Sequence, residues 1–577
     1  MLNEEIARLF ERMAHVLAFK NKDRFRIMAY ERAAISIRDL KEDLAAIAEN
    51  GKLQEIPGIG KDLSEMIEEY IATQAMKRYT SECKGVPDEL IDLMSIPGLG
   101  PKTLALLHEK IGVTSFEDLK RCLESESVRK LKGFGQKKID NIKRGIDLWL
   151  ASQQRMLISV ALPLAENLLA AIRKIDGIER ADIAGSLRRR RETIGDMDVL
   201  VISKDSPHAL KQITQLPVVN QVLGLGDTKA TVMIEGGIQV DIRAVSEESY
   251  GAALQYFTGS KQHNIHLRTL GRKHGLKFNE YGVFRGERRI GGAEEADVYE
   301  SLKMPWMPPE LREDRGEIEA ALNGKLPKLI DIGDLRGDLH THSRYSDGKS
   351  TIEEMVERAA ELGYEYIALS DHSPSERVAH GLDRKRLEKK ITEIEALRKE
   401  RKDRPPHILI GSEVDILGDG KLDYPDDILA KLDVVIAAIH SSFRQEKDRI
   451  TGRLLDAIAH PYVDVIAHPT SRLIGSRDAL GMDFERVIEA AAKSGIALEV
   501  NGSMYRLDLN DVMAKAAQEA GALLAIGSDA HSTAQLEWIR YGVFQARRGW
   551  VEARSVVNTW TWTKLSRWLK HRAAAAA

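Results

Sequence analysis

The chain has few of the features that cross-link, anchor or export a protein. Two cysteines, Cys83 and Cys122, in 577 residues exclude a disulfide framework and a zinc site built from cysteines. No apolar run approaches the roughly eighteen residues of a transmembrane helix. The first ten residues, MLNEEIARLF, contain acids where a signal peptide would contain bases. We therefore expect a cytoplasmic protein that makes no use of a membrane.

Excess charge of either sign is also missing. The formal net charge is −3, with 43% hydrophobic and 30% charged residues, which is the composition of an ordinary soluble globular protein. Bulk charge therefore does not indicate a nucleic-acid binder, and any such binding must depend on local patches. The length is too great for one hydrophobic core and predicts three or four domains.

Two acidic residues at the start of a predicted strand form the first candidate site. Asp196 and Asp198 precede the apolar run 199–202, and side chains two positions apart on a strand point to the same face. Adjacent carboxylates repel each other, and a divalent ion such as Mg²⁺ relieves that repulsion while it also binds phosphate oxygens. An isolated pair of this kind is more often two solvated surface acids, so its surroundings decide the interpretation.

The surroundings favour a polyphosphate site. Gly185 and Ser186 offer a small turn, four arginines follow at 188–191, and Gly195 lets a phosphate approach the backbone. A third carboxylate, Asp241, lies in an alternating pattern that predicts a neighbouring strand. Three carboxylates on adjacent strands can hold two metals about 3.5–4 Å apart, which stabilise the attacking and leaving oxygens of a phosphoryl transfer.

A glycine-rich pattern occurs three times in the N-terminal part, each time between helical patterns. The copies are IPGIGK at 56–61, IPGLGPK at 96–102 and a weaker LKGFGQK at 131–137. This is the helix-hairpin-helix motif, in which a tight turn at a helix start binds a DNA phosphate irrespective of base sequence. One copy alone could be an ordinary helix end. The repetition favours DNA binding through Gly58, Gly60, Lys61, Gly98, Gly100, Lys102, Gly133 and Gly135.

The order of predicted elements changes along the chain. Residues 1 to about 75 are predicted to be helical throughout. The next region of interest, from about 146 to 325, has strand patterns at 181–185, 197–203, 230–234 and 238–245, a helical stretch from Tyr250 to His274, and a hairpin strand at 279–284. Asn323-Gly324 and Pro327 then predict a linker.

From Leu335 onward short apolar strands alternate with helical patterns, which indicates βα repeats. Seven strands are predicted, and nearly every one ends in a residue that can bind a metal. Ten of the sixteen histidines lie here, and six of them stand at strand ends. A single histidine after a strand is usually a satisfied polar side chain, but six in matching positions are not explained in that way. In βα barrels such groups converge at the carboxyl ends of the strands.

Two segments resemble known families. The residues GSLRR, GDMDV, VDIR and YFTGS, which begin at positions 185, 195, 240 and 256, are similar to the core of family X DNA polymerases, the group of polymerase beta. The resemblance implies metal binding by Asp196, Asp198 and Asp241, with Asp241 helping to deprotonate the primer 3′-hydroxyl. It also implies that the incoming dNTP is contacted by Gly185, Ser186, Arg189, Gly195, Tyr256, Phe257, Gly259, Asn264 and Arg268.

The C-terminal half resembles the polymerase and histidinol phosphatase (PHP) domain, a distorted seven-stranded barrel with a trinuclear metal site. Its ligand pattern is matched in full by His340, His342, Asp347, His372, Glu413, His440, His468, Asp529 and His531. Mixed imidazole and carboxylate ligands suit Mn²⁺ or Zn²⁺ better than Mg²⁺ alone, whereas Mg²⁺ is expected at the polymerase site. Arg472 and Asn501 lie near strand ends, where they could contact phosphate or orient ligands.

The resemblance implies a multidomain α+β and α/β protein of bacterial or archaeal type. We expect an N-terminal helical DNA-binding domain at 1–75, helix-hairpin-helix fingers at 76–145, a polymerase palm and thumb at 146–325, a linker at 326–335 and a PHP phosphoesterase at 336–577. Family relatives can carry a Schiff-base lysine in the first domain. Met66 stands at that position and cannot perform this chemistry.

The leading hypothesis is a monomeric DNA repair enzyme with two active sites. One site would fill short gaps in primer-template DNA with dNTPs, and the other would act as a 3′–5′ exonuclease, with abasic-site or 3′-phosphate cleavage as further activities. A phosphatase of small phosphoesters is a second hypothesis, because histidinol phosphatases share the barrel and fold alone does not choose the substrate. A third is a non-enzymatic scaffold for DNA ends.

Overall fold

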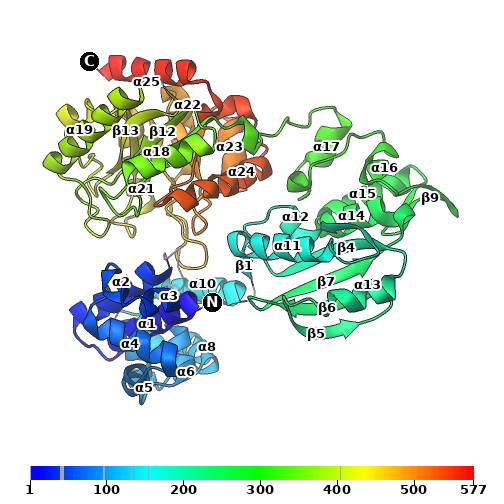
Figure 1. Cartoon of the computed structure of the whole chain (residues 1–577), viewed down its shortest axis with the longest axis horizontal. Coiled ribbons are helices and arrows are strands. Elements are labelled where there is room, and N and C mark those ends of the chain that lie inside the picture. The colour runs from blue at the N-terminus through cyan, green and yellow to red at the C-terminus, as the bar shows by residue number, and fades with distance from the viewer. Residues whose placement is uncertain are drawn as a thin grey trace. The chain divides into compact units, whose positions relative to one another are not determined.

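A computed structural model describes the chain apart from residues 1, 39–43, 74, 95, 97, 132, 154, 403 and 577. Pro97 and Lys132, within the second and third glycine-rich repeats, therefore lie outside the described residues. The chain forms two compact units, one of residues 1–154 with 475–477 and one of residues 155–474 with 478–577. Figure 1 labels many of the helices and strands of both. Among the described residues, no helix is long and apolar enough to cross a bilayer.

Among the described residues of 1–154, the regular secondary structure of the first unit is helical, as its periodicity predicts. Its helices are α1 Leu2–Phe19, α2 Arg24–Arg38, α3 Leu44–Glu49, α4 Lys61–Thr73, α5 Lys77–Cys83, α6 Asp88–Leu93, α7 Pro101–Ile111, α8 Phe116–Glu124, α9 Glu126–Arg129 and α10 Gln136–Gln153, with a 3₁₀ turn η1 at Leu53–Glu55. Two apolar clusters fill it, one built from residues 6–76 and one mainly from residues 86–146. Met66 is 4% exposed and lies inside the first cluster.

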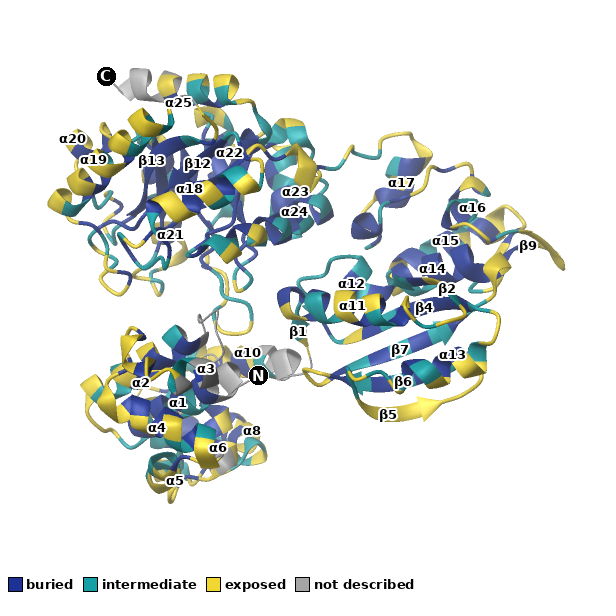
Figure 2. Ribbon diagram, in the orientation of Figure 1, coloured by how far each residue is buried: buried dark blue, intermediate teal, exposed yellow. Residues whose placement is uncertain are grey.

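A five-stranded sheet in the order β2-β4-β7-β6-β5 forms the first part of the second unit. Its strands are β2 Ile178–Ile183, β4 Asp196–Ser203, β5 Val219–Leu225, β6 Lys229–Ile234 and β7 Ile238–Ala244. The sheet packs with the helices α11 Ile158–Ile172 and α13 Ser206–Ile213. A separate short pair is formed by β1 Met156–Leu157 and β3 Thr193–Ile194. The four expected strands are confirmed to within a few residues, and the exposed edge strand β5 was missed (Figure 2).

The region after this sheet corrects one expectation. The helical stretch predicted from 250 to 274 is two helices, α14 Tyr250–Thr258 and α15 Lys261–Lys273, because Gly259 and Ser260 interrupt it. Ser260 caps the second helix, with its hydroxyl accepting from the N–H of His263 at 3.1 Å. The other elements here are β8 Lys277–Asn279, β9 Gly282–Arg285, β10 Arg288–Gly291, α16 Glu295–Glu300 and α17 Glu317–Leu322, with 3₁₀ turns η2 Glu247–Ser249 and η3 Pro309–Leu311. The short helix α12 Gly185–Arg188 lies earlier, between β2 and β3.

The rest of the second unit is a nearly closed barrel of seven parallel strands in sequential order. A parallel bridge between Thr341 and Ala530 links its first and last strands. The strands are β11 Gly337–Thr341, β12 Tyr366–Leu369, β13 His407–Asp415, β14 Val434–Ala438, β15 Val465–Ile466, β16 Ala497–Asn501 and β17 Leu523–Gly527. Most are buried on both faces, as parallel strands under helices are (Figure 2).

Helices surround this barrel. They are α18 Ile352–Glu361, α19 Arg384–Arg401, α20 Asp426–Leu429, α21 Lys447–Ala459, α22 Phe484–Ser494, α23 Asp511–Glu519, α24 Ile539–Arg548 and α25 Trp562–Ala576, with 3₁₀ turns η4 Ile332–Asp334, η5 Thr533–Trp538, η6 Ala553–Ser555 and η7 Val557–Thr559. Parallel strands place all of their carboxyl ends at one mouth. The seven predicted strands and the mixed α/β class are therefore confirmed.

Candidate active sites

The three predicted carboxylates of the five-stranded sheet lie on neighbouring strands. Asp196 and Asp198 begin β4, where Met197 between them is buried, so the two acids share the other face. β4 pairs with β7 in parallel, and this register sets Asp198 directly beside Asp241. The alternation read from the sequence is therefore present, and the pairing supplies the third carboxylate.

The pKa values of Asp198 and Asp241 are shifted in opposite directions. Burial, followed by repulsion from Asp196 and Asp241, raises the pKa of Asp198 to about 6. Burial alone would also raise the pKa of Asp241, but hydrogen bonds from Lys229 Nζ at 2.8 Å and Thr231 Oγ1 at 2.7 Å lower it. A buried carboxylate that resists ionisation beside two others is a group that a divalent cation would stabilise in its charged form.

Gly185 is required by its contact with Asp198. The glycine begins the short helix α12 with a φ of +65°, a backbone conformation that side chains disfavour. A Cβ built on Gly185 would collide with Oδ2 of Asp198. The backbone N–H of Ala184 donates to the Asp198 carbonyl at 2.8 Å. This turn therefore lies directly against the face that carries the carboxylates, with Ser186 next along it, while Gly195 joins β3 to β4.

Arg189, predicted to hold the triphosphate, has protein partners in this structure. Its Nε donates to Glu313 at 3.0 Å and its Nη1 donates to the Thr258 carbonyl at 2.6 Å. The side chain is only 12% exposed. The neighbouring Arg188 forms a two-bond pair with Glu295 at 2.6 and 2.9 Å. The arginine run thus anchors the turn to the segment that follows the sheet, an arrangement that the sequence pattern did not predict.

The predicted nucleotide-side residues of α14 and α15 contact one another. Tyr256 and Phe257 pack edge to face with centroids 5.1 Å apart. Asn264 Nδ2 donates to the Tyr256 carbonyl at 2.6 Å, and its Oδ1 accepts from Gln255 at 2.9 Å. A Cβ on Gly259 would meet that same Asn264 oxygen at 2.6 Å. Asn264 therefore fixes the backbone of the aromatic pair.

Arg268 Nε donates to the Asn264 carbonyl at 3.3 Å, and its side chain lines a hollow of about 310 Å³ on the α15 surface. Arg272 and Lys277 share the lining, together with Ile265 and Phe278. Three cations beside an apolar wall form a surface suited to a nucleic-acid backbone.

The three glycine-rich repeats share a left-handed backbone at their leading glycine. The leading glycines Gly58, Gly98 and Gly133 have φ values of +82°, +79° and +88°. The second glycines, Gly60, Gly100 and Gly135, immediately precede α4, α7 and α10, and of these only Gly100 has a positive φ, of +49°. The weaker third copy therefore resembles the first copy at both glycines. Lys61 is the first residue of α4 and Lys102 is the second residue of α7, and both side chains are exposed, beside N–H groups that can bind phosphate.

The nine predicted barrel ligands converge. Eight of them form three overlapping groups, and within each group one nitrogen or oxygen of every member lies within 4.8 Å of those of the other members. The first group is His342, Asp347, His372 and His531, the second is His340, His342 and Asp529, and the third is His372, Glu413 and His440. His468 joins through Nε2, which lies 2.8 Å from Glu413. His468 and Asp529 have positive φ values of +26° and +55°, a strained backbone that is typical of functional sites.

Buried atoms without partners show that these residues fit metal ions. In the described part of the chain, the ring nitrogen Nε2 of His340, both ring nitrogens of His342, Nδ1 of His372 and Glu413 Oε2 are buried and have no hydrogen-bond partner. Such orphaned groups are costly unless something else satisfies them. A cluster of imidazoles and carboxylates is the donor set that Mn²⁺ or Zn²⁺ accepts.

Neighbouring histidines of this cluster differ in charge. Burial alone would lower the pKa of His340, but Glu499, Glu413 and Asp529 raise it well above its ordinary value. Burial, followed by His531 and His372, lowers the pKa of His342 to about 4. His342 therefore has neutral ring nitrogens near pH 7, the form that binds a metal.

Two carboxylates that orient ligand histidines were missed by sequence reasoning. Asp415 Oδ1 lies 2.6 Å from His440 Nδ1, and Glu499 Oε1 lies 2.7 Å from His340 Nδ1. Each leaves the other nitrogen of its histidine free for the cluster. Asn501, predicted as a possible orienting residue, donates to Glu499 at 3.0 Å. The signal was present, because Asp415 follows Glu413 by two positions and Glu499 ends a predicted strand.

Arg472 has another partner. Its Nη2 donates to Glu192 of the palm at 2.7 Å and its Nε donates to the Arg506 carbonyl at 2.8 Å. It therefore ties the barrel to the palm, at the turn that carries the arginine run.

Known families match most of the chain in segments. A helix-hairpin-helix domain matches residues 1–76 and a SAM-like helix-hairpin-helix tandem matches residues 90–147. The DNA polymerase beta thumb matches residues 253–313 and the PHP domain matches residues 338–503. The segments follow the order in which the three folds occur along the chain.

Individual relatives extend this comparison. The DNA polymerase/3′-5′ exonuclease PolX of Bacillus subtilis is 38% identical over 563 residues, which cover 97% of each protein. Probable phosphatases of Thermoanaerobacter sp. and Shewanella oneidensis are 35% and 31% identical over 209 and 208 residues, 34% of this chain and 78% and 75% of those proteins. The first likeness covers nearly the full length, whereas the phosphatases match about a third.

Proposed function

Since this chain belongs to the family X DNA polymerases that carry a PHP domain, we propose that it fills short DNA gaps at the palm and trims DNA 3′ ends at the barrel. Family membership makes it a DNA polymerase with 3′–5′ exonuclease activity and sets aside the non-enzymatic scaffold. The observation that supports the finer proposal is the presence of two separate clusters of side chains able to bind cations, one around the partly buried Asp198 and one in the mouth of the barrel.

Gap filling would use Asp196, Asp198 and Asp241 as ligands of divalent ions, with Mg²⁺ as the proposed ion. When bound, such ions stabilise the negative charge that develops on phosphate oxygens. Asp241 stays ionised near neutral pH because Lys229 and Thr231 stabilise its charge, so its carboxylate can accept the proton of the primer 3′-hydroxyl. Gly185 and Gly195 leave room for the dNTP phosphates, and Ser186 and Arg189 would contact them.

The sugar and base of the dNTP would lie against Tyr256 and Phe257. Asn264 holds the backbone of this pair through the Tyr256 carbonyl and packs closely against Gly259. Arg268, one turn further along α15 than Asn264, would contact the DNA minor groove side. These assignments predict different consequences. Loss of Asn264 would displace the aromatic pair, whereas loss of Arg268 would weaken DNA binding alone.

At the barrel we propose that the nine converging ligands hold up to three ions, of Mn²⁺ or Zn²⁺, and cleave phosphodiesters at 3′ ends. Further proposed substrates are abasic sites, which present a phosphodiester, and 3′-phosphates, which present a phosphomonoester. Asp415 and Glu499 fix the rings of His440 and His340, so that ligand nitrogens face a common centre.

DNA would be held by the helix-hairpin-helix turns, with domain limits at 75, 145, 325 and 335 as the sequence predicts and a monomer as the working form. A Schiff-base lyase is not part of the proposal. Met66 is buried in the first helical core, where its sulfur accepts from the Tyr30 hydroxyl at 3.5 Å, and a thioether cannot form an imine.

Two variants separate the activities. Asp198→Asn should abolish primer extension on gapped DNA and leave Mn²⁺-dependent 3′–5′ degradation intact, while His342→Ala should give the reverse pattern. Circular dichroism and thermal unfolding of both variants control for folding. If either folded variant lost both activities, the proposal of two independent sites would be wrong.

A phosphatase of small phosphoesters is the second candidate, favoured by the likeness of about a third of the chain to probable phosphatases. Turnover of histidinol phosphate and of a DNA 3′ end should be compared under identical Mn²⁺ conditions. Our proposal expects the DNA end to have much the higher kcat/KM. A higher value for the small ester would favour the second candidate.

A further inference from the structure

A basic hollow lies at the opposite end of the barrel from the metal ligands. It has a volume of about 350 Å³ and lies where β13 begins, at His407. Glu413 lies six residues further along the same strand, which corresponds to roughly 20 Å of extended chain. The hollow is therefore a separate site from the candidate nuclease centre, and its size falls within the roughly 300–1,000 Å³ of small-molecule sites.

Cations from three elements surround this hollow. Five of its lining residues are lysine or arginine, and Asp433 is the single acid among the described residues that line it. Arg398 already pairs with Asp433 and donates to the Ile408 carbonyl at 2.8 Å. Among the described residues, no acidic side chain pairs with Lys402, Arg404 or Lys570. The hollow therefore holds uncompensated positive charge.

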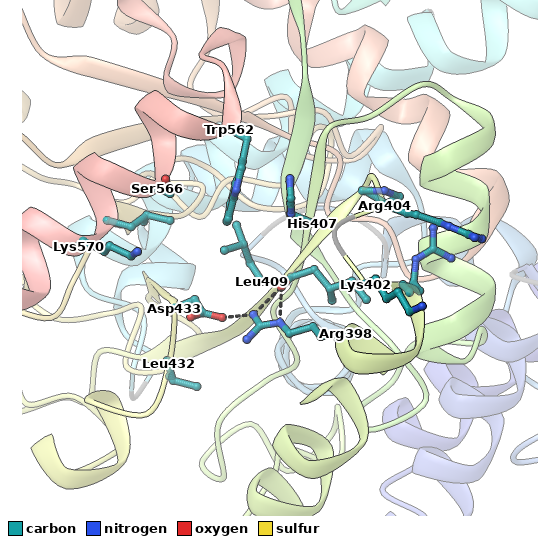
Figure 3. A pocket seen from close by; sticks show the side chains of 14 residues that line it. Arg398, Lys402, Arg404, His407, Leu409, Leu432, Asp433, Trp562, Ser566 and Lys570 are labelled. Carbon is teal, nitrogen blue, oxygen red and sulfur yellow. Dashed lines mark hydrogen bonds and ion pairs between the residues drawn. The ribbon is translucent and has the colours of Figure 1, made fainter. Parts of the chain in front are cut away.

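Two aromatic rings complete the wall. The indole of Trp562, at the start of α25, stacks on the imidazole of His407 with centroids 4.4 Å apart and planes 16° apart. In Figure 3 this pair stands between Lys570 on one side and Arg404 on the other. Flat rings flanked by free cations can accept a base and a phosphate of one ligand.

A purely structural explanation accounts for only part of this arrangement. Arg398 and Arg401 lie in the last turn of α19, where cations stabilise the helix end. That reason does not apply to Arg404, which follows the helix, or to Lys570, which belongs to α25. Free cations of like charge from separate elements repel one another across the hollow, and an anion would relieve that repulsion.

We propose that this hollow binds a nucleotide, with its phosphate between Arg404 and Lys570 and its base against the Trp562–His407 pair. The ligand is either a free nucleoside monophosphate or the terminal nucleotide of a DNA strand, which share this chemistry. The inference does not depend on the proposed function, because binding here requires neither metal site.

Calorimetric titration of the full chain in EDTA tests the proposal with three probes. They are deoxyadenosine monophosphate, inorganic phosphate and a short 5′-phosphorylated oligonucleotide. The test variant carries Arg404→Glu and Lys570→Glu. The matched control, Lys385→Glu with Lys389→Glu, makes the same charge change on two exposed residues of α19 outside the hollow.

We expect the double variant to bind deoxyadenosine monophosphate at least tenfold more weakly than the parent chain, with the control within twofold. Trp562→Phe should weaken the nucleotide more than inorganic phosphate, and primer extension should be unchanged in each variant. Tight binding of the oligonucleotide that the double variant loses, with weak binding of the free nucleotide, would identify the strand end as the source. Equal affinity of the parent and the double variant for all three probes would overturn the proposal, and so would equal affinity for phosphate and nucleotide.

Discussion

The contact between Gly185 and Asp198 illustrates how a single atom can determine this polymerase site. No side chain fits at Gly185, since a Cβ there would meet the Asp198 carboxylate and the φ of +65° already disfavours one. The sequence indicated a small residue near phosphate, but the contact with Asp198 depends on the pairing of strands and was not predictable from the motif.

Gly185→Ala should therefore reduce primer extension by about a hundredfold, since a shift of about 1 Å in a reacting group has that effect. Steady-state nucleotide incorporation measures it. Gly224→Ala in β5, where a Cβ meets nothing within 4 Å, is the matched control and should retain activity. A folded Gly185→Ala variant with normal incorporation would contradict the role of this contact.

Glu295 is the residue on which thumb stability should depend most. It accepts from Arg312 Nη1 at 2.6 Å, from Arg188, and from Trp306 Nε1 at 2.7 Å, and the Arg312 side chain is fully buried. Burial alone would raise the pKa of Glu295, but Arg312 and Arg188 hold it well below its ordinary value of 4.5.

Glu295→Gln should lower the free energy of unfolding by roughly 3 kcal/mol at pH 7, because it leaves Arg312 without its charge partner. A lowered folded-state pKa gives stability that is fully present above the unfolded-state value and is lost as pH falls through the lowered pKa. Urea unfolding should therefore show the difference between parent and variant shrinking below about pH 4.5. Glu300→Gln, exposed on the same helix, is the control. A difference that grew on acidification would contradict this account.

At the level of elements, hydrophobic periodicity and turn-forming residues predicted most of the helices and strands. Alternation located β7, the apolar run 199–202 located β4, and apolar runs ending in polar residues located all seven barrel strands. The break between α14 and α15 was missed because the helical pattern continues on both sides of Gly259. The structure shows that Asn264 leaves no room for a Cβ at this position. The edge strand β5 was missed because six of its seven residues are exposed, so it has no buried face to produce a period.

Ligand positions were predictable for the same reason. His342, His372 and His440 each follow a strand, and parallel strands bring such positions to one mouth. The orienting carboxylates Asp415 and Glu499 were not identified, since only coordinates show which ring nitrogen each one faces. Arg189 was assigned to phosphate alone, because its protein partners Glu313 and Thr258 are distant in sequence and the motif does not indicate them.

The glycine-rich turns lead to a prediction for α7. Lys102→Ala should weaken binding of gapped DNA equally for all base sequences and reduce the slope of log K against log salt by about 1, the contribution of one phosphate contact. Lys110→Ala, at the other end of the same helix, should leave the slope unchanged. Fluorescence anisotropy at several salt concentrations measures both. An unchanged slope for Lys102→Ala would remove this turn from the DNA contact.

At the scale of the whole molecule, a buried arginine of the barrel reaches the polymerase site. Arg548 in α24 is 2% exposed and donates to the Arg189 carbonyl at 2.7 Å, to Glu313 at 3.0 Å and to Asp511 at 2.6 Å. Leu507 and Tyr541 of the barrel also lie in the apolar core of the palm. The barrel therefore supports the turn that the dNTP phosphates are proposed to contact.

Arg548→Met should raise the KM for dNTP severalfold and lower the melting temperature, because Glu313 and Asp511 lose a buried charge partner, while exonuclease activity remains within about twofold. Arg554→Met, at a side chain that is 82% exposed, is the control. Separate measurement of KM and kcat distinguishes displacement of Arg189 from general loss of folded enzyme. A variant with unchanged KM and normal stability would show that the barrel does not position this turn.

The central claim is that one chain holds metal ions in two separate clusters. Anomalous X-ray scattering from crystals of the full chain soaked in Mn²⁺ tests it most directly. We predict peaks beside Asp198 and Asp241 and further peaks among His342, His372 and Glu413, with the second group alone lost in His342→Ala. Anomalous density at one cluster only, or at neither, would contradict the account.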